Sequence, residues 1–188
     1  MQKRQSGIPL WLTTPVLCSI SQGPARGSAE RVSIAAKKRL AQKCPLCDAR
    51  KDTLSPNAVS GDHTHDGRLS QTLVEVIHRI TTDPARLSRA WYEGILAAGL
   101  TDPAYVEGVS VVIHTISLDT FAPGLGLASR PLSKAANGAP SGYCPAGARH
   151  NEAYAAVIPP SEEPGDEADI YAGMFGANVQ QALTWVPD

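Results

Sequence analysis

A pair of cysteines separated by two residues is the part of this 188-residue sequence best suited to chemistry. Cys44 and Cys47 form a C-x-x-C motif that follows a lysine-rich stretch and precedes Arg50 and Lys51. The thiolate is the reactive form of cysteine, and nearby cations favour it. Two thiols at this spacing can also form an intramolecular disulfide, so that one attacks a peroxide or a disulfide and the other resolves the product. The motif therefore predicts redox chemistry, with a pair of buried, unreactive thiols as the alternative.

Two histidines downstream of the cysteines offer a different kind of site. His63 and His65 lie in segment 61–67, and with the cysteine pair they have the ligand types of a Cys2His2 zinc site. Their H-x-H spacing is shorter than is usual in such sites, and the flanking Asp62 and Asp66 suit a solvated turn equally well. We therefore expect no metal or other cofactor, and the zinc site remains an alternative.

The other histidines and several glutamates fall within predicted helices. His78 and His114 lie in apolar helical patterns and are expected in the core or lining a pocket. Glu75, Glu93 and Glu107 are expected on solvated helix faces, where charged residues usually lie.

The charge of the chain is divided unevenly along its length. The net charge is -1, yet residues 1–51 carry ten basic and two acidic residues, a net charge of +8, and the remainder carries -9. This balance argues against a nucleic-acid partner for the chain as a whole. We interpret the basic half as the electrostatic setting of the cysteine pair, since cations stabilise a thiolate.

Nothing in the sequence predicts export or a membrane span. Lys3 and Arg4 precede the apolar run 8–12 as in a signal peptide, but Pro9 and Pro15 interrupt the pattern and no A-x-A site follows. No run approaches the roughly 18 apolar residues that a membrane helix needs. Four cysteines are too few for a secreted disulfide framework in a chain of this length. We therefore expect a cytoplasmic protein.

The composition divides the chain into three segments. Residues 1–27 have no sustained period and are expected to form an irregular lead-in. Residues 28–128 carry helical spacing and no alternating strand pattern, which predicts one all-α domain. Residues 129–188 are dense in proline and glycine and are expected to be an extended arm or linker. A short helical stretch over 178–185 then suggests the start of a second unit that the chain has lost.

The first helix is predicted over residues 29–43 and leads into the cysteine pair. Ser28 is expected to cap it, and Glu30 suits the positive end of the helix dipole. The apolar residues at helical spacing predict its buried face: Val32, Ala35, Ala36 and Leu40. The lysines are expected to point elsewhere: Lys37, Lys38 and Lys43.

Three further helices follow a polar loop over residues 54–68. The second is predicted over 69–80. The third is expected to begin at residues 83–84, where Asp can cap free amides and Pro suits the first helical position, and to end at Gly99 in the left-handed conformation. A second Asp-Pro pair predicts the fourth helix over 102–118. The expected buried face of the third helix is Leu87, Ala90, Trp91, Gly94, Ile95 and Ala98.

These motifs together resemble a known family. An acidic residue on a helix precedes the C-x-x-C, residues 97–107 read Ala-Ala-Gly-Leu-Thr-Asp-Pro-Ala-Tyr-Val-Glu, and an apolar helix follows over 109–118. The region 28–128 resembles the AhpD-like alkylhydroperoxidase and carboxymuconolactone decarboxylase superfamily. The resemblance implies an all-α AhpD-like helical bundle that forms homo-oligomers. It also implies a cysteine pair that reduces a hydroperoxide and is re-reduced by a dithiol partner protein.

The resemblance also implies roles for individual residues. Cys47 would attack the peroxide, Cys44 would resolve the product, and Glu30 is the nearest match to a relay glutamate. The family motif continues as C-x-x-C-x-x-x-His, whereas this chain has Lys51 at the last position. A lysine can stabilise a thiolate but is a poor proton shuttle near neutral pH unless buried.

Because Lys51 replaces the histidine of the family motif, the sequence does not identify the residues of the proton relay. The relay is either absent or rebuilt from His63, His65 or His78. Two alternative functions therefore remain. One is a zinc-stabilised or basic interaction module, and the other is an AhpD-like unit that keeps the fold without the chemistry.

Overall fold

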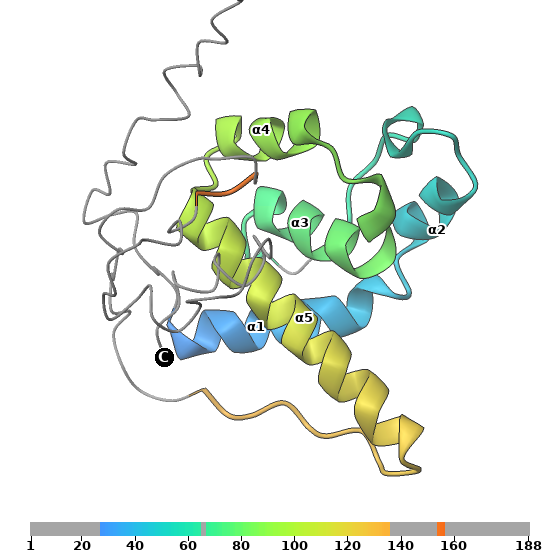
Figure 1. Ribbon diagram of the computed structural model, residues 1–188, viewed down its shortest axis with the longest axis vertical. Helices are drawn as coiled ribbons and strands as arrows, with labels where there is room; N and C mark the ends of the chain where they lie inside the picture. The colour runs from blue at the N-terminus through green and yellow to red at the C-terminus, as the bar shows by residue number, and fades with distance from the viewer. Residues whose placement is uncertain (1–26, 65–66, 136–153, 157–188) are drawn as a thin grey trace, which may run out of the picture.

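The computed structural model describes residues 27–64, 67–135 and 154–156, and these form an all-α structure, as predicted, with no strand among them (Figure 1). The elements in chain order are α1 (Ser28–Ala41), α2 (Pro45–Lys51), the 3-10 turn η2 (Pro56–Ala58), α3 (Gln71–Thr82), the 3-10 turn η3 (Pro84–Arg86), α4 (Arg89–Ala97) and α5 (Asp102–Gly124). The predicted lead-in over 1–27 lies almost wholly outside the described residues. So do most of the predicted arm and its helical stretch over 178–185.

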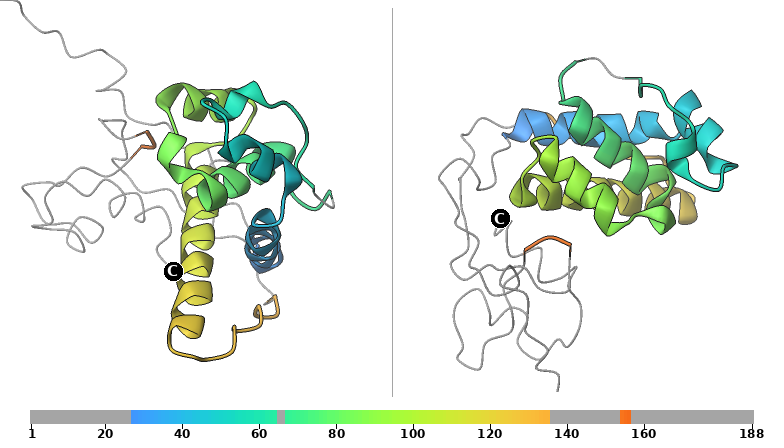
Figure 2. Two further views of the ribbon diagram at one scale, coloured as in Figure 1. Left: turned by 90° about the vertical axis from the view of Figure 1, so that its right-hand side faces the viewer. Right: turned by 90° about the horizontal axis from the view of Figure 1, so that it is seen from above.

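The core lies where α1, α3 and α5 pack on one another (Figures 1 and 2). A Cβ atom at Gly108 of α5 would lie 3.0 Å from the Leu73 side chain of α3, so these two helices approach closely at that point. Packing at this density fixes the position of α3 between its neighbours. The buried residues of this core include Ile34, Leu73, Val76, Ile77 and Val112.

α1 differs from its prediction at its start and on its buried face. Gly27 precedes the first turn, and no side chain caps it, so the predicted role of Ser28 as the cap is wrong. Ala35 is buried as predicted, and Ile34, which was not predicted, is buried beside it, whereas Leu40 is 59% exposed. The prediction from apolar spacing is therefore correct at Ala35 and wrong at Leu40.

Two lysines predicted to point away from the core are buried in α1. Lys37 is 4% exposed and donates a hydrogen bond to the backbone carbonyl of Thr64 at 3.0 Å. Lys38 is 1% exposed and pairs with Asp119 of α5 at 2.8 Å, as does Arg39 at 2.7 Å. Buried charges require such partners, and these partners lie far away in the sequence. They attach α1 to α5 and to the loop before α3.

The predicted third helix begins five residues late, at α4. The Asp83 carboxylate pairs with Arg86 at 2.8 Å and with Arg79 at 3.3 Å, and it caps no backbone amide. Residues 84–86 therefore form only η3, and Ser88 caps α4 by accepting a hydrogen bond from the Trp91 amide. The predicted helix start at residues 83–84 is therefore wrong.

The late start also changes which side of α4 is buried. Ile95 is buried as predicted, and Leu87 and Trp91 are partly buried against the core. Tyr92, which was absent from the predicted face, is 2% exposed, and its ring lies 4.8 Å from that of Tyr105. Three residues predicted to be buried are exposed: Ala90, Gly94 and Ala98.

α5 begins at the predicted place and runs further than predicted. Gly99 has the expected left-handed conformation, with φ at 94°. Thr101 caps α5 through its side chain, and Asp102 is the first helical residue. The helix continues past Leu118 to Gly124.

Within the described residues no single helix combines the length and the apolar character that crossing a membrane requires. Only α4 and α5 taken together reach that length and hydropathy, and they are bent by 117° relative to each other.

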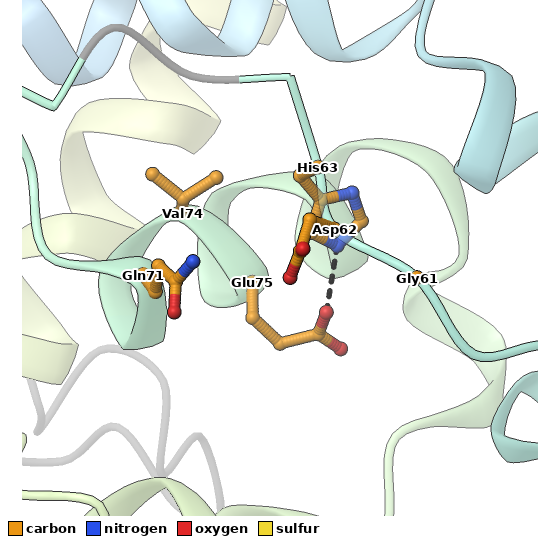
Figure 3. Close-up of a pocket in the computed structure, with 6 residues that line it drawn as sticks. All are labelled: Gly61, Asp62, His63, Gln71, Val74 and Glu75. Carbon is orange, nitrogen blue, oxygen red and sulfur yellow. Dashed lines mark hydrogen bonds and ion pairs between the residues drawn. The ribbon is translucent and has the colours of Figure 1, made fainter.

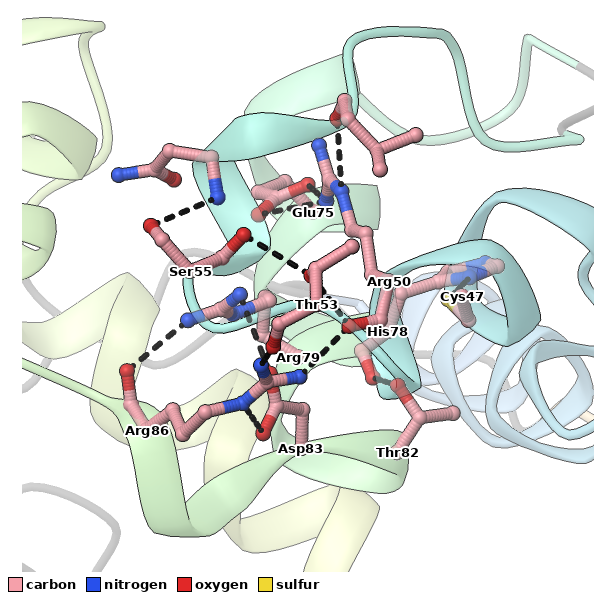
Figure 4. Close-up of polar contacts among 12 residues, drawn as sticks. Cys47, Arg50, Thr53, Ser55, Glu75, His78, Arg79, Thr82, Asp83 and Arg86 are labelled. Carbon is pink, nitrogen blue, oxygen red and sulfur yellow. Dashed lines mark hydrogen bonds and ion pairs between the residues drawn. The ribbon is translucent and has the colours of Figure 1, made fainter.

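A small lobe lies beside α3 at one end of the described helices, and we call residues 44–59 the α2 lobe (Figures 1 and 2). Arg86 holds the lobe from η3 by donating hydrogen bonds to the backbone carbonyls of Arg50 and Thr53 (Figure 4). Its interior is a satellite cluster apart from the main core: Cys44, Leu46, Cys47 and Val59. Two of the buried side chains of the lobe are therefore the cysteines themselves.

Candidate dithiol site

Two cysteines and two histidines meet between the α2 lobe and α3, and we call these four residues the Cys2His2 cluster. Cys44 directly precedes α2, Cys47 lies in its first turn, His63 comes from the loop before α3, and His78 lies on α3. All four side chains are buried, and their sulfur and nitrogen donor atoms lie within 4.8 Å of one another. Both cysteines are free thiols.

The loop that carries His63 closes over the α2 lobe. Gly61 has φ at 154°, and a Cβ atom there would lie 3.2 Å from the Leu46 side chain. A residue with a side chain would be strained and crowded at this position. The hydrogen bond from Lys37 to the Thr64 carbonyl holds the other side of the loop. His63 is therefore fixed by contacts on both sides.

The two imidazole rings direct their Nδ1 atoms at the sulfurs. His63 Nδ1 lies 3.5 Å from Cys44 Sγ and 3.6 Å from Cys47 Sγ. His78 Nδ1 lies 3.3 Å from Cys47 Sγ, and the centroids of the two rings are 4.0 Å apart. Nδ1 of His63 therefore contacts both sulfurs, and the sulfur of Cys47 contacts both imidazole rings.

On the side away from the sulfurs, His63 contacts the carboxylate of Glu75, which in turn contacts the guanidinium of Arg50. His63 Nε2 lies 2.6 Å from the Glu75 carboxylate (Figure 3). Arg50 lies 3.1 Å from the same carboxylate (Figure 4). Glu75 and His78 are three residues apart on α3, which places them on one side of the helix. The result is a chain of contacts from Arg50 through Glu75 and His63 to the cysteine sulfurs.

The contacts with His63 shift the pKa values of its neighbours. Burial alone would raise the pKa of Cys44, but hydrogen bonds with His63, with the backbone of Cys47 and Thr64 and with the Cys47 side chain together outweigh it and lower the pKa from 9.0 to about 7. Burial would also raise the pKa of Glu75, but the hydrogen bond with His63 and the charge of Arg50 lower it to about 2. Glu75 is therefore a carboxylate at neutral pH.

The two histidines differ in charge. Burial favours the neutral form of His63, yet its hydrogen bonds with Cys47, Glu75 and Cys44 raise its pKa to about 10. Burial and the charge of His63 lower the pKa of His78 to about 3. His78 Nε2 has no hydrogen-bond partner within the described part of the chain. Cys47 therefore lies between a charged and a neutral imidazole.

A pocket of about 160 Å³ reaches the cluster from the side of His63 and Glu75 (Figure 3). It is lined by Gly61, Asp62, His63, Gln71, Val74 and Glu75. Neither cysteine lines this pocket, and Cys44 and Cys47 are only 3% and 5% exposed. The sulfurs therefore lie behind the imidazole of His63 as seen from the pocket.

The structure brings together some of the predicted site residues and separates others. Cys44, Cys47 and His63 meet, whereas His65 lies outside the described residues. Glu30 is in the first turn of α1, and a helix of this length places it roughly 20 Å from Cys44. Lys51 is half exposed and pairs with Asp48 at 2.7 Å. Neither Glu30 nor Lys51 belongs to the cluster.

Two glutamates lie in a different environment from the one predicted, and one histidine lies in the predicted environment beside an unexpected neighbour. Glu75, predicted to be solvated, is partly buried against His63. Glu107, also predicted to be solvated, is 1% exposed and pairs with Arg31 at 2.7 Å, outside the cluster. His78 is buried as expected, but beside Cys47. The spacing of Glu75 and His78 was the one local signal that could have associated them.

Comparison with known proteins leaves the family of this chain open. No family model, no curated protein and no solved structure matches it. The AhpD-like assignment therefore stays a prediction from sequence motifs. The function has to be inferred from the Cys2His2 cluster and its surroundings.

Proposed function

We propose that this protein is a thiol-dependent oxidoreductase of the alkylhydroperoxidase type, in which Cys44 and Cys47 reduce a hydroperoxide. The observation that carries the proposal is the position of His63, whose Nδ1 lies 3.5 and 3.6 Å from the two sulfurs while Glu75 binds its other nitrogen. A positioned acid next to a nucleophilic thiol is the arrangement that thiol chemistry requires. The resemblance to the AhpD-like superfamily supports the same reaction.

In this proposal, His63 and Glu75 form the proton relay. The family pattern would place a histidine at residue 51 and a glutamate near residue 30, but Lys51 and Glu30 lie outside the cluster. His63 reaches the sulfurs from the loop before α3, and Glu75 reaches His63 from α3 itself. The relay is thus rebuilt from a different part of the chain.

The proposed reaction proceeds in two steps. The Cys47 thiolate attacks the terminal oxygen of the hydroperoxide, an S–O bond forms, the O–O bond breaks, and His63 protonates the departing alkoxide. The Cys44 thiolate then attacks the sulfur of the sulfenic acid, a disulfide forms, the S–O bond breaks, and the hydroxyl takes a second proton from solvent and leaves as water. The two protons taken up replace the two that the thiols released when they ionised. Two thiols and one hydroperoxide thus give one disulfide, one alcohol and one water.

Peroxide attack is assigned to Cys47 because its sulfur contacts both imidazoles. Cys44, with the pKa lowered to about 7, is suited to attack the sulfenic acid as a thiolate. It is also suited to leave when a partner thiol attacks the disulfide, because thiols of lower pKa leave faster. A dithiol partner protein supplies the two electrons that complete the cycle, as a reducing cytoplasm would allow.

The burial of the sulfurs limits the size of the substrate. Cys44 and Cys47 are 3% and 5% exposed, and the adjoining pocket has a volume of about 160 Å³. Such limited access to the sulfurs favours a small hydroperoxide over a bulky lipid hydroperoxide. We accordingly propose small alkyl hydroperoxides and hydrogen peroxide as substrates.

Exposed apolar side chains support the proposed homo-oligomer. They lie on the second half of α5 and just beyond it: Ile113, Leu118, Phe121, Leu125 and Leu127. Association with a second copy of the chain would bury such exposed apolar side chains.

The test uses a full-length parent variant in which Cys18 and Cys144 are replaced by serine, so that only the motif cysteines remain. The reduced protein is treated with tert-butyl hydroperoxide in a chelating buffer, and free thiols and intact mass are measured over time. We expect loss of both thiols, a disulfide, and one alcohol formed per disulfide. Retention of both thiols in excess peroxide would overturn the proposal.

A further inference from the structure

We propose that Cys44, Cys47, His63 and His78 also bind one Zn²⁺ ion, through the two Sγ atoms and the two Nδ1 atoms. Metal binding goes beyond the proposed function and does not depend on it. Two thiolates and two imidazoles are a donor set of structural zinc sites, whereas magnesium and calcium prefer oxygen.

The distances between the donor atoms fit a tetrahedral ion. With Zn–S bonds of about 2.3 Å and Zn–N bonds of about 2.0–2.1 Å, a tetrahedron has sulfur-to-nitrogen edges of about 3.6 Å. The three such distances described above are 3.5, 3.6 and 3.3 Å. All the donor atoms lie within 4.8 Å of one another. The three measured edges already fit one ion, and small shifts of the side chains would bring the remaining donor pairs to the same spacing.

Hydrogen bonding alone explains the arrangement less well. A single N–H of His63 cannot point straight at two sulfurs at once, although its Nδ1 is nearly equidistant from both. His78 also directs Nδ1 at Cys47, although that sulfur already contacts His63. Convergence of four donor atoms on one point is what a metal ion requires.

The surroundings of His63 match those of a metal ligand. Histidine ligands usually donate their second N–H to a carboxylate, which fixes the ring and raises its basicity. Glu75 occupies that position at 2.6 Å from Nε2, and Arg50 holds Glu75 at 3.1 Å. His78 Nε2 has no such partner among the described residues. Glu75 is therefore inferred to be a positioning residue that acts on the metal through His63.

A zinc ion at the Cys2His2 cluster would connect two parts of the fold. The cysteines belong to the α2 lobe, whose remaining apolar interior is small: Leu46 and Val59. The histidines belong to α3 and to the loop before it. A shared ion would bind the lobe to α3 directly, as structural zinc does in small units with little core of their own.

Zinc and peroxide would compete for the same two sulfurs, and this consequence rests on the proposed function. The zinc-bound dithiolate, one hydroperoxide and two protons give the disulfide, free Zn²⁺, one alcohol and one water. The cysteines lose two electrons and the O–O bond gains them, while zinc keeps its charge. One zinc ion is thus released for each disulfide formed.

The experiment uses Co²⁺ as a spectroscopic probe in the full-length parent with only Cys44 and Cys47. The reduced, chelator-treated protein is titrated with Co²⁺ under anaerobic conditions. We expect the intense visible bands of tetrahedral cobalt and a sulfur-to-cobalt charge-transfer band, both saturating at one equivalent and both removed by one equivalent of Zn²⁺. Weak octahedral bands, or no saturation, would overturn the site.

Matched variants assign the ligands. Cys47→Ser and His78→Ala are expected to lose the tetrahedral spectrum, whereas His114→Ala, at an exposed position on α5, is expected to keep it. Far-ultraviolet circular dichroism checks that each variant stays helical. If His78→Ala unfolds, Cys44→Ser takes its place. A tetrahedral spectrum that survives in both folded cysteine variants would overturn the assignment.

The two proposals fail separately. A tetrahedral cobalt spectrum together with thiols that resist peroxide supports the zinc site and overturns the oxidoreductase. Peroxide-dependent disulfide formation without saturable cobalt binding supports the oxidoreductase and overturns the zinc site. In the zinc-loaded protein, a chromogenic chelator is expected to report one Zn²⁺ released per disulfide, and oxidation with zinc retained would overturn the competition.

Discussion

The carboxylate of Glu75 lies 2.6 Å from Nε2 of His63, on the side of the imidazole opposite to the sulfurs of Cys44 and Cys47. This contact fixes the orientation of the ring and leaves Nδ1 for the sulfurs. Arg50 fixes Glu75 in turn. The position of the ring therefore depends on residues that do not touch the cysteines.

Replacing Glu75 with Gln is expected to slow peroxide-dependent thiol loss by roughly 10- to 100-fold. The amide keeps the size of the side chain but removes the charge that favours protonated His63, so the pKa of His63 falls from about 10. The initial rate measured across pH checks this, and the slowing should be greatest at alkaline pH. Glu93→Gln, at an exposed glutamate of α4, is the matched control. Rates within twofold of each other in the two variants would contradict the relay.

The order of attack can be read from single-cysteine variants. On the parent without Cys18 and Cys144, Cys44→Ser is expected to accumulate a sulfenic acid at Cys47 that a dimedone probe traps. Cys47→Ser is expected to accumulate none. Mass spectrometry of the labelled peptide makes the measurement. If the sulfenic acid instead accumulates at Cys44 in the Cys47→Ser variant, Cys44, the thiol with the lowered pKa, is the residue that attacks the peroxide.

The thiolate of Cys44 is expected to form near neutral pH in the metal-free protein. Its pKa is lowered from 9.0 to about 7, so its ionised fraction rises as the pH increases through 7 and falls as the pH decreases through that value. Ultraviolet absorbance of the thiolate, followed from acid to alkaline pH, measures this transition. Cys44→Ser should remove the step near pH 7. A parent protein with no step below pH 8.5 would contradict the prediction.

Asp119 is expected to contribute strongly to stability because it neutralises Lys38, which is 1% exposed. Asp119→Ala leaves a buried ammonium without its partner and should lower the free energy of unfolding by about 3 kcal/mol. Asp48→Ala removes the exposed pair with Lys51 and should cost no more than about 0.5 kcal/mol. Urea denaturation of both variants measures the difference. Equal losses would contradict the burial argument.

The sequence predicts most of the secondary structure where the signals are local. Helical spacing over 69–80 locates α3, and Gly99 followed by an Asp-Pro pair locates the turn before α5. The face of α1 could not be found in this way, because Lys38 is buried only by virtue of Asp119, which lies 81 residues further along the chain. Asp83 fails as a cap for a related reason, since Arg79 and Arg86 occupy its carboxylate.

The candidate site was only partly accessible from the sequence. Residue type and spacing identify Cys44 and Cys47, and the loop composition identifies His63 as a candidate ligand. Glu75 and His78 share one side of α3, but which side faces the α2 lobe depends on how α1 and α5 pack around α3. That packing is a tertiary property and leaves no local signal at these positions.

The cysteines are at once the reactive atoms of the α2 lobe and much of its buried interior. A disulfide between Cys44 and Cys47 would close a ring of only four residues and would tie the lobe to nothing else. Contacts from the sulfurs to His63 and His78 instead join the lobe to α3. Chemistry at the sulfurs therefore alters the mechanical attachment of the lobe, so that protease resistance around residues 44–59 should track the redox state of the protein.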